Sequence, residues 1–418
     1  MRALPEILEV SENLIGTTGR VADLFTGTTV VAQAFAQRGY IVAAADTQRY
    51  GVIFAHAMLG IGRKVEESCS FSTLTALGLT EVRADIREPW TQYCEREAAA
   101  LARSDAQDLV GMASELPLFW RLPDHPLRPH ILTNGPRSAL GEAPLLTGIY
   151  AGSYLGVQQA IVLDEIRQNA ELAKAAGRIS VWQYNAALTA IMSAASAASH
   201  SAGKHFAQPL TAGSSRNVKF LTGRLLQDRR VDIENEFKIA CNAIDTRAVA
   251  AEGGHQAWLG PAENFVTGND TADLYYLDPP YTAQQYSRFY HVLETICTYE
   301  YPQLFGSGGL TTGLYPTDRY KSAFSSKVKA GAAFQAILSQ AYKCDAAVVI
   351  SYSQSSAASN GNARMISLEQ LLDLCSAEYG RQNVNWLELS HRYRQFNSAQ
   401  ASNSRRDDPE ILITCKQR

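Results

Sequence analysis

Residues Asp278-Pro279-Pro280-Tyr281 offer, within four positions, groups that can bind and orient an amine on a planar ring. The mostly apolar run 273–277 before them predicts a strand. Two consecutive prolines must end it, because proline fixes φ and has no backbone N–H to donate. A rigid loop is therefore expected at the carboxyl end of a strand, where open α/β sheets bind ligands. A carboxylate and prolyl carbonyls beside a flat aromatic face suit a base with an exocyclic amine; the alternative is an ordinary polar turn.

This loop resembles the catalytic loop of amino-methylating, S-adenosylmethionine-dependent methyltransferases. Its continuation, residues 282–291, is similar to that of the Dam-like DNA adenine-N6 methyltransferases. The resemblance covers roughly residues 1–65 and 255–418. It implies S-adenosylmethionine as cofactor, an adenine flipped out of the DNA as substrate, and a catalytic role for Asp278, Pro279, Pro280 and Tyr281.

A second motif lies in residues 21–29, where a short strand, a turn at Gly27 and a helix follow one another. This order opens a Rossmann-like unit, in which glycine lets a ligand approach the backbone. The next strand, 40–45, ends at Asp46, where such folds accept hydrogen bonds from a ribose. The alternative for this aspartate is an ordinary capping residue. The motif resembles the family's cofactor loop and implies cofactor contacts from Asp23, Phe25, Thr26, Gly27, Thr28 and Asp46.

Three departures from the family pattern concern the cofactor. Thr29 stands where the family has its last glycine, and no Gly-Ser-Lys-type turn precedes the first helix. The second of these predicts either an incomplete cofactor lid or a start that is placed late. Pro261 occupies the position of the aspartate that binds the cofactor's adenine amine, which leaves Glu263, Asn264 and Asp270 as open substitutes.

Between these motifs the chain loses its strand–helix alternation and predicts helices at 96–116, 158–175 and 181–199. The expected fold class is therefore α/β: a Rossmann-like methyltransferase sheet with a largely helical insert. We expect a cofactor-binding half at 1–85, the insert at 86–250, and a catalytic half with a C-terminal hairpin at 251–418. The insert has the position of the family's target-recognition domain; a helical elaboration packed on the sheet is the alternative.

Two basic clusters are candidates for contacts with phosphates. The hairpin loop carries four arginines near Tyr393 and Phe396, which makes it the better DNA-binding candidate: Arg392, Arg394, Arg405 and Arg406. The second cluster lies in the insert and comprises Arg216, Lys219, Arg224, Arg229 and Arg230. Nearby acids would make it a solvated charged face instead: Asp228, Asp232, Glu234 and Glu236.

Composition limits the remaining classes. The 418 residues include 46% hydrophobic and 19% charged residues with a net charge of −3, so the chain is globular without an overall basic signature. Its seven cysteines are widely spaced, which predicts neither a disulfide framework nor a zinc site. We therefore expect no metal, no membrane partner and a cytoplasmic location.

The function expected from the resemblance is transfer of a methyl group to the N6 amine of a flipped adenine in double-stranded DNA. A restriction-modification or defence system is the expected setting, with a cognate nuclease as a candidate partner. Two alternatives stay open: a methyltransferase-like DNA-binding subunit with weak or no activity, and an RNA adenine methyltransferase.

Overall fold

The computed structural model describes residues 3–121, 144–210, 218–249, 253–267, 271–353, 363–393 and 408–417. The chain forms two compact units, each built from separate stretches of sequence. Unit 1 comprises Met1–Val65, Ala248–Ser287 and Tyr320–Arg418; unit 2 comprises Glu66–Arg247 and Arg288–Arg319. The division differs from the expected one at three places: residues 66–85 and 288–319 are grouped with the insert, and residues 248–250 with the sheet.

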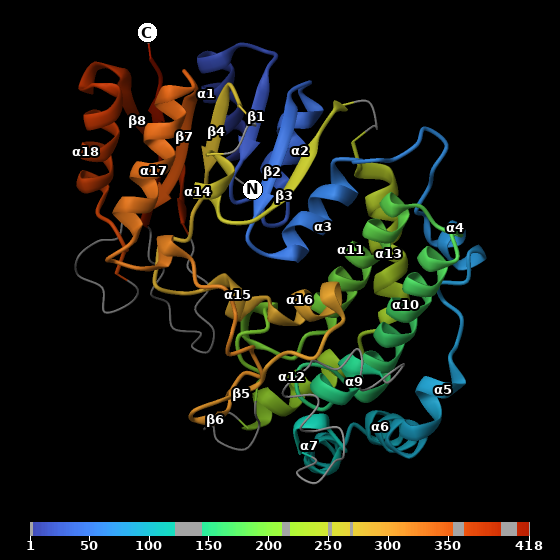
Figure 1. The fold of residues 1–418 in the computed structure, drawn as a ribbon. Coiled ribbons are helices and arrows are strands. Elements are labelled where there is room, and N and C mark those ends of the chain that lie inside the picture. Colours follow the sequence, from blue (N-terminus) through green and yellow to red (C-terminus); the bar gives the residue numbers. More distant parts are fainter. Residues whose placement is uncertain are drawn as a thin grey trace. The chain divides into compact units, whose positions relative to one another are not determined.

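Unit 1 is built on a seven-stranded sheet in the order β3-β2-β1-β4-β7-β9-β8 (Figure 1). β1, β2, β3, β4 and β7 are parallel, and β9 runs antiparallel to both of its neighbours. This confirms a mixed α/β fold with a Rossmann-like sheet. The strands are β1 (Arg20–Asp23), β2 (Ile41–Asp46), β3 (Gln256–Leu259), β4 (Leu274–Leu277), β7 (Ala347–Ser353), β8 (Val384–Tyr393) and β9 (Asp408–Cys415).

Both faces of the sheet are covered, because successive side chains of a strand point to opposite sides. Tyr275 and Leu277 of β4 pack in one core, while Leu274 and Tyr276 pack in the other. The first core contains residues of α14 (Ala262–Phe265), α17 (Ala330–Lys343) and α18 (Leu368–Tyr379). The second contains residues of α1 (Leu4–Ile15), α2 (Val30–Gln37) and α3 (Arg49–Met58).

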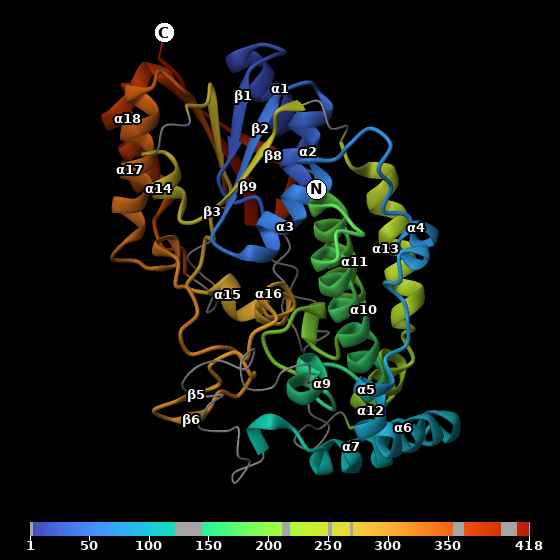
Figure 2. The same cartoon turned by 45° about the vertical axis from the view of Figure 1, so that its right-hand side comes forward.

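Unit 2 is mainly helical and has the long helices α10 and α11 at its centre (Figure 2). Both are buried on most sides, and α11 begins with a reciprocal cap: the N–H of Gln183 donates to Ser180 Oγ, and the N–H of Ser180 donates to Gln183 Oε1. Its helices are α4 (Phe71–Ala76), α5 (Ala84–Arg87), α6 (Thr91–Arg103), α7 (Ala106–Glu115), α9 (Leu145–Tyr150), α10 (Val157–Ala175), α11 (Val181–Ala198), α12 (Val218–Arg229), α13 (Ile233–Arg247) and α16 (His291–Thr298). β5 (Phe305–Gly306) pairs with β6 (Gly309–Leu310), and α15 (Tyr286–Phe289) crosses the boundary between the units.

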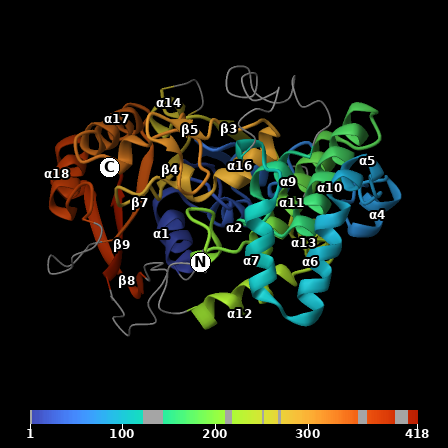
Figure 3. The ribbon, with the colours of Figure 1, turned by 90° about the horizontal axis from the view of Figure 1, so that it is seen from below.

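The helix expected at 96–116 is two helices, α6 and α7, which lie side by side (Figure 3). The break falls at Ser104, whose φ of 56° is left-handed. Asp105 then caps α7 by accepting hydrogen bonds from the N–H groups of Gln107 and Asp108. Serine and aspartate favour such local bonds over the helix interior, which explains a break that apolar periodicity did not reveal. Within the described residues, no helix combines the length and apolar character needed to cross a bilayer.

Candidate active site

Three predicted site carboxylates belong to adjacent parallel strands. Asp23 ends β1, Asp46 ends β2, and Asp278 follows the last residue of β4. β1 lies between the other two strands, with Asp23 in register with Ala44 of β2 and Tyr276 of β4. Because carboxyl ends of parallel strands share one edge, the two motifs meet at the ligand-binding edge of the sheet.

The predicted cofactor loop is held in place by backbone hydrogen bonds to β2. The N–H of Thr26 donates to the carbonyl of Ala45 at 3.0 Å, and the N–H of Gly27 donates to Asp46 Oδ2 at 2.9 Å. Gly27 has a left-handed φ of 48°, which explains a glycine at this turn. Phe25 donates its N–H to Asp23 Oδ1 at 3.4 Å. The loop that contains Phe25, Thr26, Gly27 and Thr28 is therefore fixed between two of the site carboxylates.

Thr29 keeps the backbone conformation that glycine would adopt. Its φ of 63° is left-handed, which is rare for a β-branched residue. Its side chain is buried: Oγ1 donates to the carbonyl of Thr28 at 2.7 Å and accepts from the amide of Gln33 at 2.8 Å. These bonds explain how the strained conformation persists. Thr29 therefore differs from the family's glycine in its side chain but keeps the same backbone turn.

The loop from Asp278 to Tyr281 packs tightly onto β7. Pro279 and Pro280 are buried, and the hydroxyl of Tyr281 donates to Asp278 Oδ1. The Tyr281 ring meets the ring of Tyr352 edge-on, with 5.4 Å between the centroids. The N–H of Met365 donates to the Tyr281 carbonyl at 3.1 Å. Both the backbone and the side chain of Tyr281 are therefore held in place.

Sequence reasoning missed the residues that surround Tyr281. Ser351 Oγ lies 3.4 Å from the Tyr281 hydroxyl, and the guanidinium of Arg364 lies 5.7 Å from the ring centroid. Arg364 is itself oriented by Ser353, whose carbonyl and hydroxyl accept from it at 2.5 and 2.9 Å. The only signal was the polar and aromatic run 351–353 inside a buried apolar strand.

The three carboxylates hold protons more tightly than ordinary aspartates. Burial is the main cause, raising the pKa of Asp23 to about 7 and the pKa values of Asp46 and Asp278 to about 6. Negative charge on the other two carboxylates raises the pKa of Asp23 further. None of the three has a lysine or arginine ion-pair partner in the part of the chain that the structure describes. Buried carboxylates without a basic partner attract a cation. Groups with strongly shifted pKa values also cluster at functional sites, so these three aspartates are candidates for a ligand-binding role.

The substitutes considered for the adenine contact remain unassigned. Pro261 precedes α14 and has an extended conformation, so it supplies a carbonyl but no N–H. Glu263 is half-buried and Asn264 is exposed in that helix, whereas Asp270 lies outside the described residues.

The four hairpin arginines are largely beyond what the structure describes. Arg392 lies in β8, where it is in register with Pro409 of β9. Arg394, Arg405 and Arg406 lie outside the described residues, so their role in DNA binding stays a prediction. The hairpin itself is confirmed as the β8–β9 pair.

The arginines of the insert cluster are engaged within unit 2. Arg224 forms an ion pair with Asp228 at 2.9 Å, as the alternative interpretation expected. Arg229 and Arg230 instead donate to backbone carbonyls, of Ser153 at 2.9 Å and Leu101 at 3.0 Å. Arg216 lies outside the described residues, as does the side chain of Lys219.

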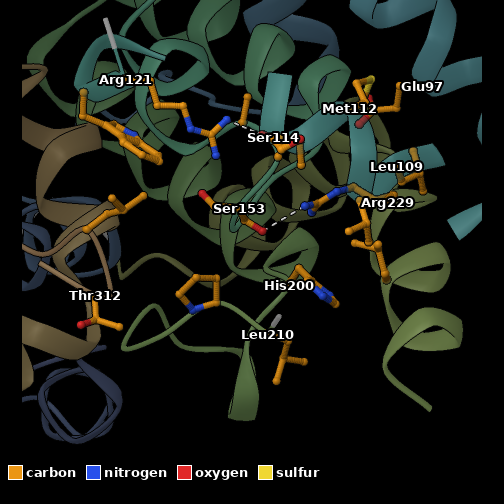
Figure 4. A pocket seen from close by; sticks show the side chains of 18 of the residues that line it. Glu97, Leu109, Met112, Ser114, Arg121, Ser153, His200, Leu210, Arg229 and Thr312 are labelled. Atoms are coloured by element: carbon orange, nitrogen blue, oxygen red, sulfur yellow. Dashed lines mark hydrogen bonds between the residues drawn. The ribbon is translucent and has the colours of Figure 1, made fainter. Parts of the chain in front are cut away.

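Unit 2 also contains a cavity of about 390 Å³ that the sequence did not predict (Figure 4). Arg229 and Ser153 point toward one another in its wall, joined by the hydrogen bond described above. Glu97 accepts two backbone N–H groups at the start of α10, and His200 Nδ1 lies 2.9 Å from Asp228. The charged groups of the lining therefore stabilise the unit's own helices.

Unit 1 therefore has a Rossmann-like sheet, and the Asp278–Tyr281 loop follows its strand β4. Residues 261–344, which include this loop, match the family model described as D12 class N6 adenine-specific DNA methyltransferase. The match confirms the family resemblance predicted from the sequence.

Three known modification enzymes are similar to this chain. Modification methylase LlaI of Lactococcus lactis subsp. lactis is 25% identical over 249 residues, which are 60% of this chain and 34% of that protein. Modification methylase StsI of Streptococcus sanguinis is 25% identical over 328 residues, which are 78% of this chain and 39% of that protein. Type II methyltransferase M.FokI of Planomicrobium okeanokoites is 42% identical over 69 residues, which are 16% of this chain and 10% of that protein. The chain thus spans well under half the length of each relative, and no solved structure matches it.

Proposed function

We propose that this chain is a DNA adenine-N6 methyltransferase that uses S-adenosylmethionine. The observation that carries the proposal is the meeting of the cofactor loop and the Asp278–Tyr281 loop at one sheet edge, on adjacent strands β1 and β4. The family match includes the second of these loops, and the similar proteins are named as modification methylases or a type II methyltransferase.

The site fits a cationic cofactor. Three carboxylates without a lysine or arginine partner among the described residues produce a negative potential, which a sulfonium and an ammonium group would neutralise. Asp23, Phe25, Thr26, Gly27, Thr28 and Asp46 are the residues proposed to hold S-adenosylmethionine. When bound, this cofactor supplies the methyl group.

The catalytic loop would bind and orient the adenine amine. Asp278 and the carbonyl of Pro279 would each accept one amine hydrogen, which directs the nitrogen lone pair away from them. A carboxylate also stabilises the positive charge that develops on that nitrogen. Because an ionised carboxylate has about four acceptor positions, Asp278 Oδ2 stays usable while Oδ1 holds the Tyr281 hydroxyl.

Tyr281 would provide the stacking face that compensates for part of the cost of flipping the base. Its ring is half-buried, and its edge-on contact with Tyr352 fixes one side of it. The Tyr281–Asp278 hydrogen bond adds a second role, because it sets the rotamer of the acceptor carboxylate. Rates of such direct transfers depend largely on holding the two reactants in attack geometry.

Unit 2 is the proposed target-recognition domain, with DNA contacts also from the β8–β9 hairpin through Arg392, Arg394, Arg405 and Arg406. A restriction-modification or defence system is the proposed setting, in agreement with the names of the similar proteins. A cognate restriction or defence nuclease is then the expected partner.

The direct test is transfer of labelled methyl from S-adenosylmethionine to unmethylated duplex DNA, with the product nucleosides identified. Label recovered as N6-methyladenine would support the proposal. DNA binding without transfer would favour the DNA-binding subunit, which the loss of an acidic side chain at Pro261 also favours. Transfer to RNA alone would replace the proposed substrate.

A substitution at Gly51 tests the proposed cofactor site through binding alone, without measuring methyl transfer. A Cβ at this position of α3 would lie 2.8 Å from Asp46 Oδ2 and 2.9 Å from its Cγ, which is too close for either atom. Alanine should favour the helix by about 1 kcal/mol, yet it must displace Asp46. We expect Gly51→Ala to weaken S-adenosylmethionine binding about tenfold or more in calorimetric titration, the cost of losing one charged hydrogen bond.

Gly331→Ala is the matched control. Gly331 also lies within a helix of unit 1, α17, where an added Cβ meets no atom within 4 Å. This variant should gain stability and bind the cofactor as the wild type does. Unchanged affinity in Gly51→Ala would contradict the assignment of Asp46.

A further inference from the structure

Two arginines of unit 2 lie against one tyrosine ring. The guanidinium carbon of Arg288 is 5.1 Å from the centroid of Tyr315, and that of Arg319 is 4.6 Å from the same centroid. Arg288 and Arg319 are the first and last residues of the segment that unit 2 takes from the C-terminal half of the chain. All three side chains are partly exposed, so a ligand can reach this Arg288–Tyr315–Arg319 cluster.

The two guanidinium groups have few protein partners. Each Nε is buried and lacks a hydrogen-bond acceptor within the described ranges of the chain. Among the described residues, Arg319 donates only to the carbonyl of Pro316, at 3.2 Å. Neither arginine forms an ion pair with a described carboxylate, including the adjacent, exposed Asp318. Elsewhere in unit 2 such pairs are common, as between Arg87 and Glu165 at 2.6 Å.

This arrangement is electrostatically unfavourable unless an anion joins it. Two like charges on one ring repel each other, and a buried N–H without a partner costs roughly 1–3 kcal/mol. The neighbouring His291 adds no third positive charge, because burial lowers its pKa to about 3 and the ring is neutral. Both guanidinium groups lie against the Tyr315 ring, and less entropy is lost per hydrogen bond when a planar guanidinium binds an oxyanion than when a flexible ammonium does.

We propose that the Arg288–Tyr315–Arg319 cluster binds a phosphate of the DNA backbone, an inference that rests on the proposed function. Guanidinium forks bind phosphate oxygens in pairs, and protein–DNA interfaces use most of their hydrogen bonds on the backbone.

The experiment compares wild type with Arg288→Gln, Arg319→Gln and the double variant in DNA binding at several salt concentrations and in methyl transfer. Loss of one phosphate contact should reduce the slope of log K against log salt by about 0.9. We expect weaker binding on every duplex sequence and a raised KM for DNA, with kcat at saturating DNA unchanged. Excess inorganic phosphate at constant ionic strength should weaken wild-type DNA binding more than it weakens the double variant.

Control variants separate this role from folding. Arg178→Gln removes another exposed arginine of unit 2, which donates to the Leu77 carbonyl, and should leave the salt slope unchanged. Tyr315→Phe keeps the ring and should behave as wild type. Arg288→Lys and Arg319→Lys retain the positive charge but lose the planar guanidinium group. These variants should keep most of the slope of log K against log salt and bind DNA less tightly. Their unfolding temperature should equal that of the wild type.

The outcomes distinguish the two proposals. An active wild type whose double variant keeps the salt slope and KM would overturn the phosphate site alone. Phosphate competition without any effect of the variants on DNA would assign the cluster to a small free anion and also overturn it. If the variants weaken DNA binding as expected but the wild type transfers no methyl group, the proposed activity is rejected and the phosphate site is retained. A wild type that does not bind DNA would remove both.

Discussion

Asp278→Asn is expected to lower kcat for methyl transfer by about a hundredfold to a thousandfold, the usual effect of removing one preorganised electrostatic group. Asparagine has nearly the same shape, so the loop should fold, but its amide carries no negative charge for the developing cation. The KM for DNA should change little, since Asp278 contributes mainly in the transition state. Single-turnover methyl transfer at saturating cofactor and DNA measures this effect, and a rate within threefold of wild type would exclude the assigned role.

The pH dependence of the same step gives an independent check. Burial raises the pKa of Asp278 to about 6, so the active carboxylate is lost as the pH falls through this value. The Tyr281 hydroxyl opposes that shift by donating to the carboxylate, which lowers the pKa. Tyr281→Phe should therefore move the acidic limb of the rate profile to higher pH, while a purely structural tyrosine would leave the limb in place.

Asp23→Asn is expected to stabilise the protein at alkaline pH and to weaken cofactor binding. Burial raises the pKa of Asp23 from 3.8 to about 7, so between these values the folded protein retains a proton that the unfolded chain releases. Wild-type stability attributable to this group therefore falls as the pH rises from about 4 to 7. Above pH 7 the penalty reaches at most about 4 kcal/mol, and asparagine removes it.

Urea unfolding at pH 5 and pH 8 measures the difference. The gain from Asp23→Asn should be larger at pH 8 than at pH 5, and it should be accompanied by a loss of S-adenosylmethionine affinity. Asp373→Asn, which changes an exposed carboxylate of α18, is the control and should show no such gain at pH 8. A stability gain that is equal at both pH values would mean that charge burial is not its cause.

The sequence predicted the sheet because its signals are local. The strand before Asp278, the double proline and the glycine turn at Gly27 each determine conformation within a few residues, and β1, β2 and β4 confirm them. The position of Asp46 also followed from local pattern. These residues identify the site edge without any knowledge of the insert.

The remaining features depend on contacts between distant residues, which periodicity does not encode. Nothing in the sequence around Arg288 and Arg319 indicated that one tyrosine ring would bring them together. The hydrogen bond from Tyr281 to Asp278 likewise depends on the packing of Tyr281 against β7. The break at Ser104 depends on local backbone geometry, because the alanine-rich end of α6 favours continuation of the helix.

The division of both units among separate stretches of chain has a consequence for biosynthesis. β1 pairs with β4, whose residues emerge from the ribosome only after most of unit 2 has been made. Unit 2 in turn lacks its last segment until Arg319 has been synthesised. Such long-range pairings slow folding, since loop closure is costly before the contacts form. Neither unit can be completed early, so nascent chains expose apolar strands for longer than a sequential pair of domains would, and chaperone demand should rise accordingly.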